Sequence, residues 1–315
     1  MAKSDDIFQT KIDFIEVSED RLKGKISKAE RYLLSELLTK VIPSLSKKDG
    51  VIEFTTSNVI AINKGLESIF KQFDKTINLN IVKSLLSDFN NVSKLNTSYF
   101  SVVSEVDPLE FKDITKNVKN LMQQSLGYTA KGKIKPNTFI ANLTKSDFIK
   151  TSIRESVIRG VQQGLPVKDL MTELRSSILT NDDGLGVMNK YYNEIVRDKY
   201  SEFERAESKA YAGVLGMTAF IYAGGKVQDT RTFCCQRNTK VFLREETDKW
   251  RGMKWQGKNK NYNPLIDLGG YQCRHSTQWI TNQSAMRKRS DLKEDSNGKL
   301  VIDKTKAKQK LNSCK

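Results

Sequence analysis

Three of the four cysteines and the only histidine of this 315-residue chain lie in one stretch, Asp229 to Ile280. Cys234 and Cys235 are adjacent in it, and Cys273 comes two residues before His275. Thiolate sulfur and imidazole nitrogen are ligands that zinc prefers in structural sites, where four ligands surround the ion as a tetrahedron. These four side chains therefore form a candidate zinc site, with the metal as a structural cofactor that adds folding energy to a small module.

The spacing leaves other roles open. Successive side chains of an extended backbone point to opposite faces, so Cys234 and Cys235 suit one ion less well than a pair separated by two residues. Cys273 and His275, two residues apart, would face the same side of a strand, which suits shared ligation. A contact between cysteines of the two loops, oxidised or reduced, and plain burial of the thiols are the alternatives.

A cysteine nucleophile with an imidazole base is a further possibility, in which His275 would have to be the base. No nucleophile-elbow or protease signature surrounds it, and the chain has no phosphate loop, dinucleotide fingerprint or paired-carboxylate motif. The glycine pairs Gly224-Gly225 and Gly269-Gly270 lack the strand–loop–helix context that a nucleotide site requires. We therefore predict that the protein is not an enzyme and that no residue is catalytic.

Positive charge is concentrated in the last third of the chain. The formal net charge is +16, and residues 226–315 hold 21 Lys and Arg against 9 Asp and Glu, compared with 32 against 28 in residues 1–225. This density favours a polyanionic partner, either nucleic acid or an acidic protein surface, with a solvated face as the alternative. The candidate nucleic-acid contacts are seven cations: Arg251, Lys254, Lys258, Lys260, Arg287, Lys288 and Arg289.

Composition limits where such a protein works. No run of residues approaches the roughly 20 apolar positions needed to span a bilayer. The first residues lack the apolar core of a signal peptide, so we expect a protein that is made in a cytoplasm and needs no membrane. Cysteines in that setting are more often reduced or metal-bound than paired in a disulfide framework.

The elements that must position these residues are mostly helices. Apolar residues recur at helical spacing from Leu22 to Ile42, and Pro43 ends the run. A second helix is predicted from about Ser57 to Phe73, and a third from Pro108 to about Leu126, with Asp107 as its N-cap.

The middle of the chain is predicted to contain three more helices. One ends at Gly164, the next runs from Pro166 to Ile178, and the longest runs from about Val187 to Met217. The buried face of the longest helix is predicted at six positions: Tyr191, Ile195, Phe203, Ala206, Ala210 and Val214. After these helices come three short runs with strand-like composition, at 220–222, 241–243 and 278–280.

The predicted fold class is α+β, with a mostly α-helical body, a small C-terminal β-containing module and a basic tail. The second domain is placed at 137–285. The parts in chain order are an N-terminal helical domain (1–130), a basic linker with Gly and Pro (131–136), helices (137–218), the β-module (219–285) and a basic flexible tail (286–315).

The order of these features resembles a known family. A helix contains the segment 203–211, a strand 220–222 follows, and then come Asp229, Arg231 and Thr232 ahead of the cysteine pair. The strand at 240–242, a loop with Pro264-Leu265, and the closing residues Cys273, Arg274 and His275 complete the set. Over about residues 145–282 the chain is similar to the tailed-phage head morphogenesis proteins, the Mu F-like minor head proteins.

Three departures from the family pattern bear on the site. The cysteines here are adjacent, where the family more often separates them by two residues, and His275 stands where a second cysteine is usual. The segment Gly269-Gly270-Tyr271-Gln272 replaces the family's His-Pro lead. The exchange of cysteine for His275 keeps a metal ligand at that position.

The resemblance implies a minor capsid protein of a tailed bacteriophage. Such a protein binds the portal inside the head, near the packaged double-stranded DNA, and aids procapsid assembly, DNA packaging and ejection. It would meet scaffold or major capsid protein in the host cytoplasm and then stay in the virion near the portal vertex. The motif residues Asp229, Arg231, Thr232, Cys234, Cys235, Cys273, Arg274 and His275 would then be structural.

Two other functions remain as alternatives. Mu F-like modules also occur in bacterial polymorphic toxins, fused to an enzymatic domain. The N-terminal 130 residues here contain neither histidine nor cysteine, which argues against a toxin domain of that kind. A free, non-specific nucleic-acid-binding protein is the second alternative, because the charge alone names no particular partner.

Overall fold

We analysed a computed structural model that describes residues 2–129, 131–182, 184–225 and 230–314, so Asp229 lies outside the described residues. The structure is 62% helical with a few small antiparallel sheets, mostly in the C-terminal half, which confirms the predicted α+β class. Among the described helices, none is long and apolar enough to cross a membrane.

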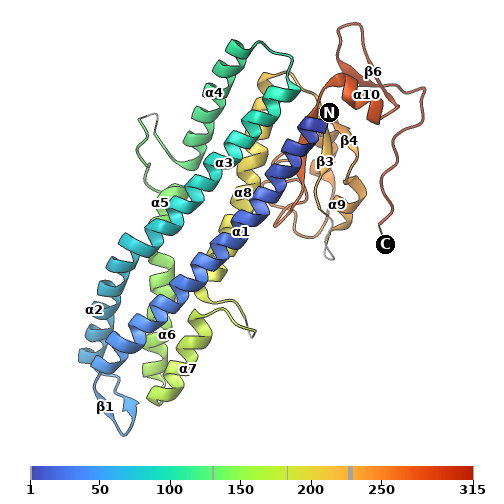
Figure 1. The fold of residues 1–315 in the computed structure, drawn as a ribbon. Coiled ribbons are helices and arrows are strands. Elements are labelled where there is room, and N and C mark those ends of the chain that lie inside the picture. The colour runs from blue at the N-terminus through green and yellow to red at the C-terminus, as the bar shows by residue number, and fades with distance from the viewer. Residues whose placement is uncertain (1, 130, 183, 226–229, 315) are drawn as a thin grey trace. The chain divides into compact units, whose positions relative to one another are not determined.

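The elements follow one another along the chain as drawn in Figure 1. The α-helices are α1 (Ala2–Glu36), α2 (Thr56–Phe73), α3 (Leu79–Val103), α4 (Pro108–Leu126), α5 (Phe139–Leu143), α6 (Asp147–Gln162), α7 (Val167–Ile178), α8 (Val187–Val214), α9 (Thr232–Arg237) and α10 (Asn282–Lys288). Shorter helical turns are η1 (Leu37–Val41), η2 (Ile42–Ser44), η3 (Asp74–Asn78) and η4 (Arg244–Gly252). The strands are β1 (Lys47–Lys48), β2 (Val51–Ile52), β3 (Ala219–Ala223), β4 (Val241–Leu243), β5 (Ser276–Ile280), β6 (Leu292–Glu294) and β7 (Leu300–Ile302).

Most predicted elements lie where the sequence patterns indicate them. Helices α2, α4, α6, α7 and α8 match predicted segments, and β3, β4 and β5 cover the three predicted strand runs. Helix α3 is absent from the sequence-based prediction. Its sequence is rich in Asn and Ser, which have low helix propensity, but buried apolar residues such as Ile81, Leu85 and Phe89 stabilise it through packing.

The chain forms two compact units. The first unit consists of Met1–Glu16, Phe89–Ser125 and Arg197–Lys315, and the second of Val17–Asp88 and Leu126–Val196. This division differs from the boundaries predicted from sequence, because helices α1, α3 and α8 each contribute residues to both units. The 131–136 segment, predicted as a linker, belongs wholly to the second unit.

In the second unit, α6 packs against both α2 and α7, and their apolar faces are buried, with Ile62, Leu66, Val157 and Leu170 fully excluded from solvent. A buried carboxylate, Glu30, organises the segment before α8. It accepts hydrogen bonds from the backbone N–H groups of residues 180 and 189, at 3.1 and 3.2 Å.

The candidate site lies in the first unit, next to a three-stranded antiparallel sheet. Its strand order is β4-β3-β5, so β3 is central and pairs with Val241–Leu243 on one side and Ser276–Ile280 on the other. Every residue of β5 is buried, and so are the first four of β3. This explains why both strands lack apolar–polar alternation: each is covered on both faces.

The buried face of α8 in the first unit is charged. Its buried residues include Glu204, Arg205 and Glu207, none of which was predicted to be buried. Polar side chains can occupy core positions when other segments supply hydrogen-bond partners and counter-charges. The apolar period of this helix therefore does not mark its whole buried face.

The predicted buried positions of α8 have mixed outcomes. Phe203 is buried as expected, whereas Val214 is 57% exposed, and Ala206 and Ala210 are only partly buried. The remaining two positions, 191 and 195, have side chains outside the described part of the chain.

One of these buried groups, Glu204, is ion-paired. The Lys11 ammonium from α1 contacts a Glu204 carboxylate oxygen at 2.5 Å, and both side chains are 1% exposed. Glu204 also accepts hydrogen bonds from the hydroxyls of Ser208 and Ser276. Burial alone would raise the pKa of Glu204. Lys11 and the two hydroxyls lower this pKa by more than burial raises it, so the pKa of Glu204 lies below its usual value.

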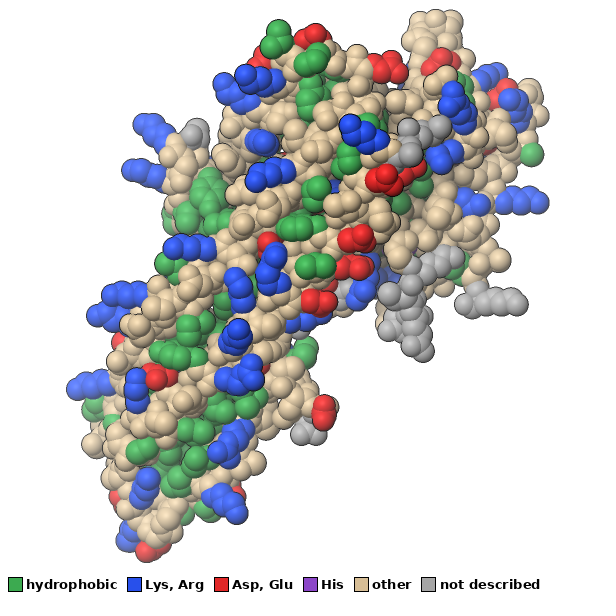
Figure 2. Space-filling model, in the orientation of Figure 1, with side chains coloured by type: hydrophobic (Ala, Val, Ile, Leu, Met, Phe, Trp, Pro, Cys, Tyr) green, Lys and Arg blue, Asp and Glu red, His purple; other side chains and the backbone are tan. Residues whose placement is uncertain are grey.

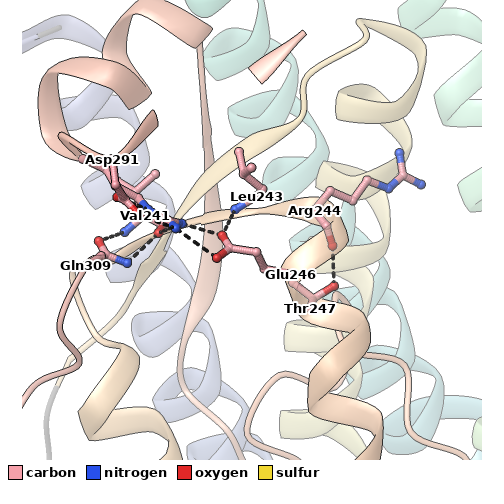
Figure 3. A network of polar contacts seen from close by, with 8 residues as sticks. Val241, Leu243, Arg244, Glu246, Thr247, Asp291 and Gln309 are labelled. Carbon is pink, nitrogen blue, oxygen red and sulfur yellow. Dashed lines mark hydrogen bonds and ion pairs between the residues drawn. The ribbon is translucent and has the colours of Figure 1, made fainter. Parts of the chain in front are cut away.

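The C-terminal segment is bound to the rest of the module, so the prediction of a flexible tail at 286–315 is wrong. Strands β6 and β7 pair, and the Gln309 amide both accepts from the backbone N–H of Val241, at 3.2 Å, and donates to its carbonyl, at 2.8 Å (Figure 3). The Asn312 side chain donates to the carbonyls of Cys235 and Asn238. A disulfide joins Cys235 to Cys314, so the segment is fastened along the edge strand β4.

The Lys11–Glu204 pair gives a stability prediction. Glu204→Gln should destabilise the protein by about 3–5 kcal/mol, because it leaves a buried ammonium without its counter-charge. The double variant Lys11→Met/Glu204→Gln should lose less than the sum of the two single variants in urea denaturation. The exposed pair Lys23–Asp20, replaced in the same way, is the control and should change stability by about 1 kcal/mol or less. A Glu204→Gln cost as small as the control's would contradict the prediction.

Candidate functional site

Three of the four predicted ligands meet in one buried cluster, which we call the Cys–His cluster: Cys234, Cys273 and His275. Their ligand atoms all lie within 4.8 Å of one another. The two sulfur atoms are 3.8 Å apart, and the Cys273 sulfur is 3.9 Å from Nδ1 of His275. Cys234 comes from α9, while the other two lie in the loop entering β5.

The fourth predicted ligand is elsewhere. Cys235 follows Cys234 on the short helix α9, so its side chain leaves the helix in a different direction. It forms the disulfide with Cys314 and belongs to the fastening of the C-terminal segment. The structure therefore corrects the predicted four-ligand set to three.

The two free thiols of the Cys–His cluster are electrostatically unlike. The pKa of Cys273 lies well below its usual value, because it receives a hydrogen bond from Cys234 and lies near Arg205 and His275. The pKa of Cys234 is raised by its hydrogen bond to Cys273 and by burial. Of the two thiols, Cys273 therefore gives up its proton more readily than Cys234.

Polar groups surround the two sulfurs. The Tyr222 hydroxyl, from the central strand β3, donates to the Cys234 sulfur at 3.2 Å and lies 3.8 Å from the Cys273 sulfur. The backbone N–H of Gly269 donates to the Cys273 sulfur at 3.3 Å. His275 Nδ1 faces the sulfurs, and its Nε2, although buried, has no hydrogen-bond partner among the described residues.

Two glycines allow this close packing. A Cβ on Gly269 would lie 2.2 Å from the Cys234 sulfur, and a Cβ on Gly224 would lie 2.8 Å from Cα of His275. Both glycines come from the Gly-Gly pairs to which the sequence assigned no role. Their function is to let backbone approach the Cys–His cluster where no side chain would fit.

Arg205 on α8 holds the loop that carries two members of the cluster. Its guanidinium donates to the carbonyls of His275 at 2.8 Å, Ile266 at 2.9 Å and Cys273. The residue is 2% exposed, and a planar guanidinium can satisfy three carbonyls in one fixed arrangement. Arg205 therefore positions the cluster without belonging to it.

Arg231 fixes the neighbouring loops. Its guanidinium donates to the carbonyls of Gln256 at 2.9 Å and Tyr271 at 2.6 Å, and so joins the start of α9 to two parts of the connection between η4 and β5. Thr232 and Arg274, the remaining predicted motif residues, are exposed. Among the described motif residues, three are therefore buried in the cluster, Arg231 and Cys235 are half-buried, and two face solvent.

The predicted nucleic-acid contacts also divide. Arg251, Lys254, Lys260, Arg287 and Lys288 are exposed and can face a partner. The other two predicted contacts, Lys258 and Arg289, are half-buried and buried, respectively.

Lys258 and Arg289 are therefore corrections to the predicted contact set. The Lys258 ammonium donates to three backbone carbonyls and lies 4.8 Å from two aromatic ring centroids. Arg289 is 5% exposed and pairs with Glu246 and Asp291, the network drawn in Figure 3. Neither cation is available to a phosphate, because each is already bound within the protein.

The Cys–His cluster can hold a metal ion. Two thiolates bound at about 2.3 Å to a tetrahedral ion lie about 3.8 Å apart, which is the observed separation of the two sulfurs. The same atoms can alternatively remain a thiol–thiolate pair. Each member is at most 4% exposed, so no substrate reaches them and the arrangement suits a structural role.

Sequence reasoning missed Tyr222, Gly269 and Cys314 as parts of this region, and did not recognise the role of Arg205. Of these residues, only Arg205 could have been recognised from the sequence, because the charged residues at 204, 205 and 207 interrupt the apolar period of a long helix. No family model, curated protein or solved structure matches the chain.

Proposed function

We propose that this protein is a minor capsid protein of a tailed bacteriophage, bound to the portal inside the head, where it aids procapsid assembly and DNA packaging and ejection. The observation that supports this proposal is the convergence of the ordered motif residues in one small module. Arg205, Arg231, Cys234, Cys273 and His275 are spread over 71 residues of sequence and together fasten the connection between η4 and β5 to α8 and α9.

The module is a structural device in this proposal. Arg205 and Arg231 use their guanidinium groups on backbone carbonyls of the same loops, and the Cys–His cluster is closed to solvent. Residues used in this way define the shape of a surface and carry out no reaction on a substrate. This supports a non-enzymatic role, in which the module presents loops and cations to the portal and to the DNA.

Non-specific contact with double-stranded DNA is assigned to the exposed cations. On the face drawn in Figure 2, Lys and Arg side chains are spread over the surface and outnumber Asp and Glu. Of the predicted contacts, the five exposed ones are Arg251, Lys254, Lys260, Arg287 and Lys288. Phosphate contacts of this kind carry no sequence information and weaken with salt.

Zinc is the metal that the Cys–His cluster suits best. Two thiolates and one imidazole are a soft and borderline ligand set, and the sulfur separation fits a tetrahedral ion. The Tyr222 hydroxyl lies beside both sulfurs. Bound there, zinc would stabilise the loop that enters β5.

The capsid assignment predicts that the protein copurifies with phage particles. Quantitative mass spectrometry of DNase-treated, gradient-purified particles should find it at a small fraction of the major capsid protein's abundance, and isolated portal protein should capture it in solution. The DNase step removes association through free DNA. Absence from particles, together with no portal capture, would refute the assignment.

The DNA contact predicts a localised salt effect. The variant Lys254→Gln/Lys260→Gln/Arg287→Gln/Lys288→Gln should bind duplex DNA more weakly. The slope of log affinity against log salt should fall by about 0.9 for each phosphate that the variant no longer neutralises. The control removes the same charge from the second unit, at Lys47, Lys48, Lys71 and Lys75, which are also exposed. Equal losses of affinity in the two variants, measured by fluorescence anisotropy, would contradict a specific DNA-facing surface.

The zinc site predicts a stoichiometry. Reduced protein reconstituted with zinc and then desalted should retain about one ion per chain, and Cys273→Ala should lose it. Cys235→Ser is the matched control: it removes the neighbouring cysteine, which lies outside the cluster, and should keep the ion. Elemental analysis that finds no zinc in the reduced wild-type protein would exclude the site.

A further inference from the structure

A second group of cations in the first unit lies around a cavity that, unlike the closed Cys–His cluster, is open to solvent. The cavity has a volume of about 380 Å³ and lies between the C-terminal half of α8, the start of η4, the 263–265 loop and β7. Its cations are Lys209, Arg244, Arg251 and Lys299, and we call it the cationic pocket.

The positive charges of the cationic pocket are only partly compensated. Two acidic side chains, Glu245 and Asp248, also line it, which leaves an excess of two positive charges. Glu245 pairs with Lys299 at 3.4 Å and Asp248 with Arg251 at 3.7 Å, and all four of these side chains are more than half exposed. Such pairs exchange readily for a better anion.

Lys209 and Arg244 have no carboxylate partner among the described residues. Lys209 is half-buried, and its pKa is lowered by burial and by the nearby guanidinium groups of Arg244 and Arg251. Cations that are held close together without a counter-charge repel each other, and an anion bound between them relieves that repulsion. Figure 3 shows Arg244 directed away from the Glu246 network, so that network does not neutralise it.

The remaining lining gives the cationic pocket a mixed character. Leu243, Leu265 and Leu300 are buried apolar residues of its lining, and the Thr218 hydroxyl, also in the lining, has no hydrogen-bond partner among the described residues. An apolar lining with a few converging polar groups is typical of small-molecule sites, and the volume falls in the usual range for them, about 300–1,000 Å³.

We infer that the cationic pocket binds a phosphate-bearing ligand, with Lys209 and Arg244 on the phosphate. Guanidinium and ammonium groups are the side chains that recognise phosphate, through charge-assisted hydrogen bonds. The phosphate can come from a small molecule of nucleotide size or from the end of a DNA strand. This inference does not depend on the capsid assignment, because it uses different residues from the exposed DNA-facing set, except for Arg251.

The test uses the full-length protein and defined probes. Inorganic phosphate, pyrophosphate and ATP are titrated by isothermal calorimetry at constant ionic strength, with chloride as the reference anion. Short duplexes with and without a 5′-phosphate are compared in the same buffer. Wild-type protein should bind at least one phosphate probe, and preference for ATP or for the 5′-phosphorylated duplex identifies the source. No binding of any phosphate probe, or binding no tighter than that of chloride, would overturn the inference.

Two variants make the result specific. Lys209→Gln/Arg244→Gln should lower the affinity for the phosphate probe by at least about tenfold, the effect of removing one charge-assisted hydrogen bond. Lys254→Gln/Lys260→Gln removes the same charge outside the pocket and should leave that affinity unchanged. Equal losses in both variants would overturn the inference. If the Lys209 change prevents folding, the single variant Arg244→Gln replaces the double variant in the test, because Arg244 is exposed and its substitution leaves the core intact.

The two variants also separate this inference from the DNA contact. Loss of duplex affinity in Lys254→Gln/Lys260→Gln, with phosphate binding intact, would support both assignments independently. Loss of neither property in either variant would contradict both. Phosphate binding that responds only to the pocket variant, with no DNA affinity at all, would remove the DNA contact and keep the cationic pocket.

Discussion

The burial of charge on one face of α8 is the constraint on which the first unit depends. Glu204, Arg205 and Glu207 are each at most 2% exposed, and an ionisable group removed from water needs a counter-charge or hydrogen-bond partners in place of the water it loses. The three residues therefore require partners from other segments. Lys11 from α1, hydroxyl and amide groups of α3 and β5, and the carbonyls of the loop before β5 supply them.

The Cys–His cluster follows from that constraint. Arg205 fixes the carbonyls of Cys273 and His275, and this orients their side chains toward Cys234 and Tyr222. The glycines at 269 and 224 then allow the backbone to close around the sulfurs and the imidazole. A metal ion bound there would strengthen an arrangement that one arginine already holds, so the cluster contributes to the shape of the module more than to a reaction.

The cations of the first unit have three different roles, although their sequence context is similar. Arg205, Arg231, Lys258 and Arg289 are bound to carbonyls or carboxylates and hold loops together. Others are exposed and available to a partner. The cationic pocket forms a third group, in which neither Lys209 nor Arg244 is paired with a carboxylate of the described residues. Net charge predicts that a polyanion can bind, whereas the partners of each cation decide where it can bind.

The sequence by itself determined the helix-dominated α+β class, the short strands of the module and the concentration of Cys, His and positive charge in the last third. These depend on local periodicity, composition and capping, which act over a few residues. Helix α3 was not predicted, because packing and not helix propensity stabilises its Asn- and Ser-rich sequence. Only the tertiary structure decided which side chains meet. Cys235 and Cys314 are 79 residues apart and form a disulfide, while Cys234 and Cys273 remain free in the cluster. The predicted face of α8 was partly wrong because Glu204 and Arg205 find partners 193 and about 70 residues away, which no local pattern records. Pairing across such distances depends on the packed fold as a whole, and it is this pairing that separates structural residues from those available to a partner.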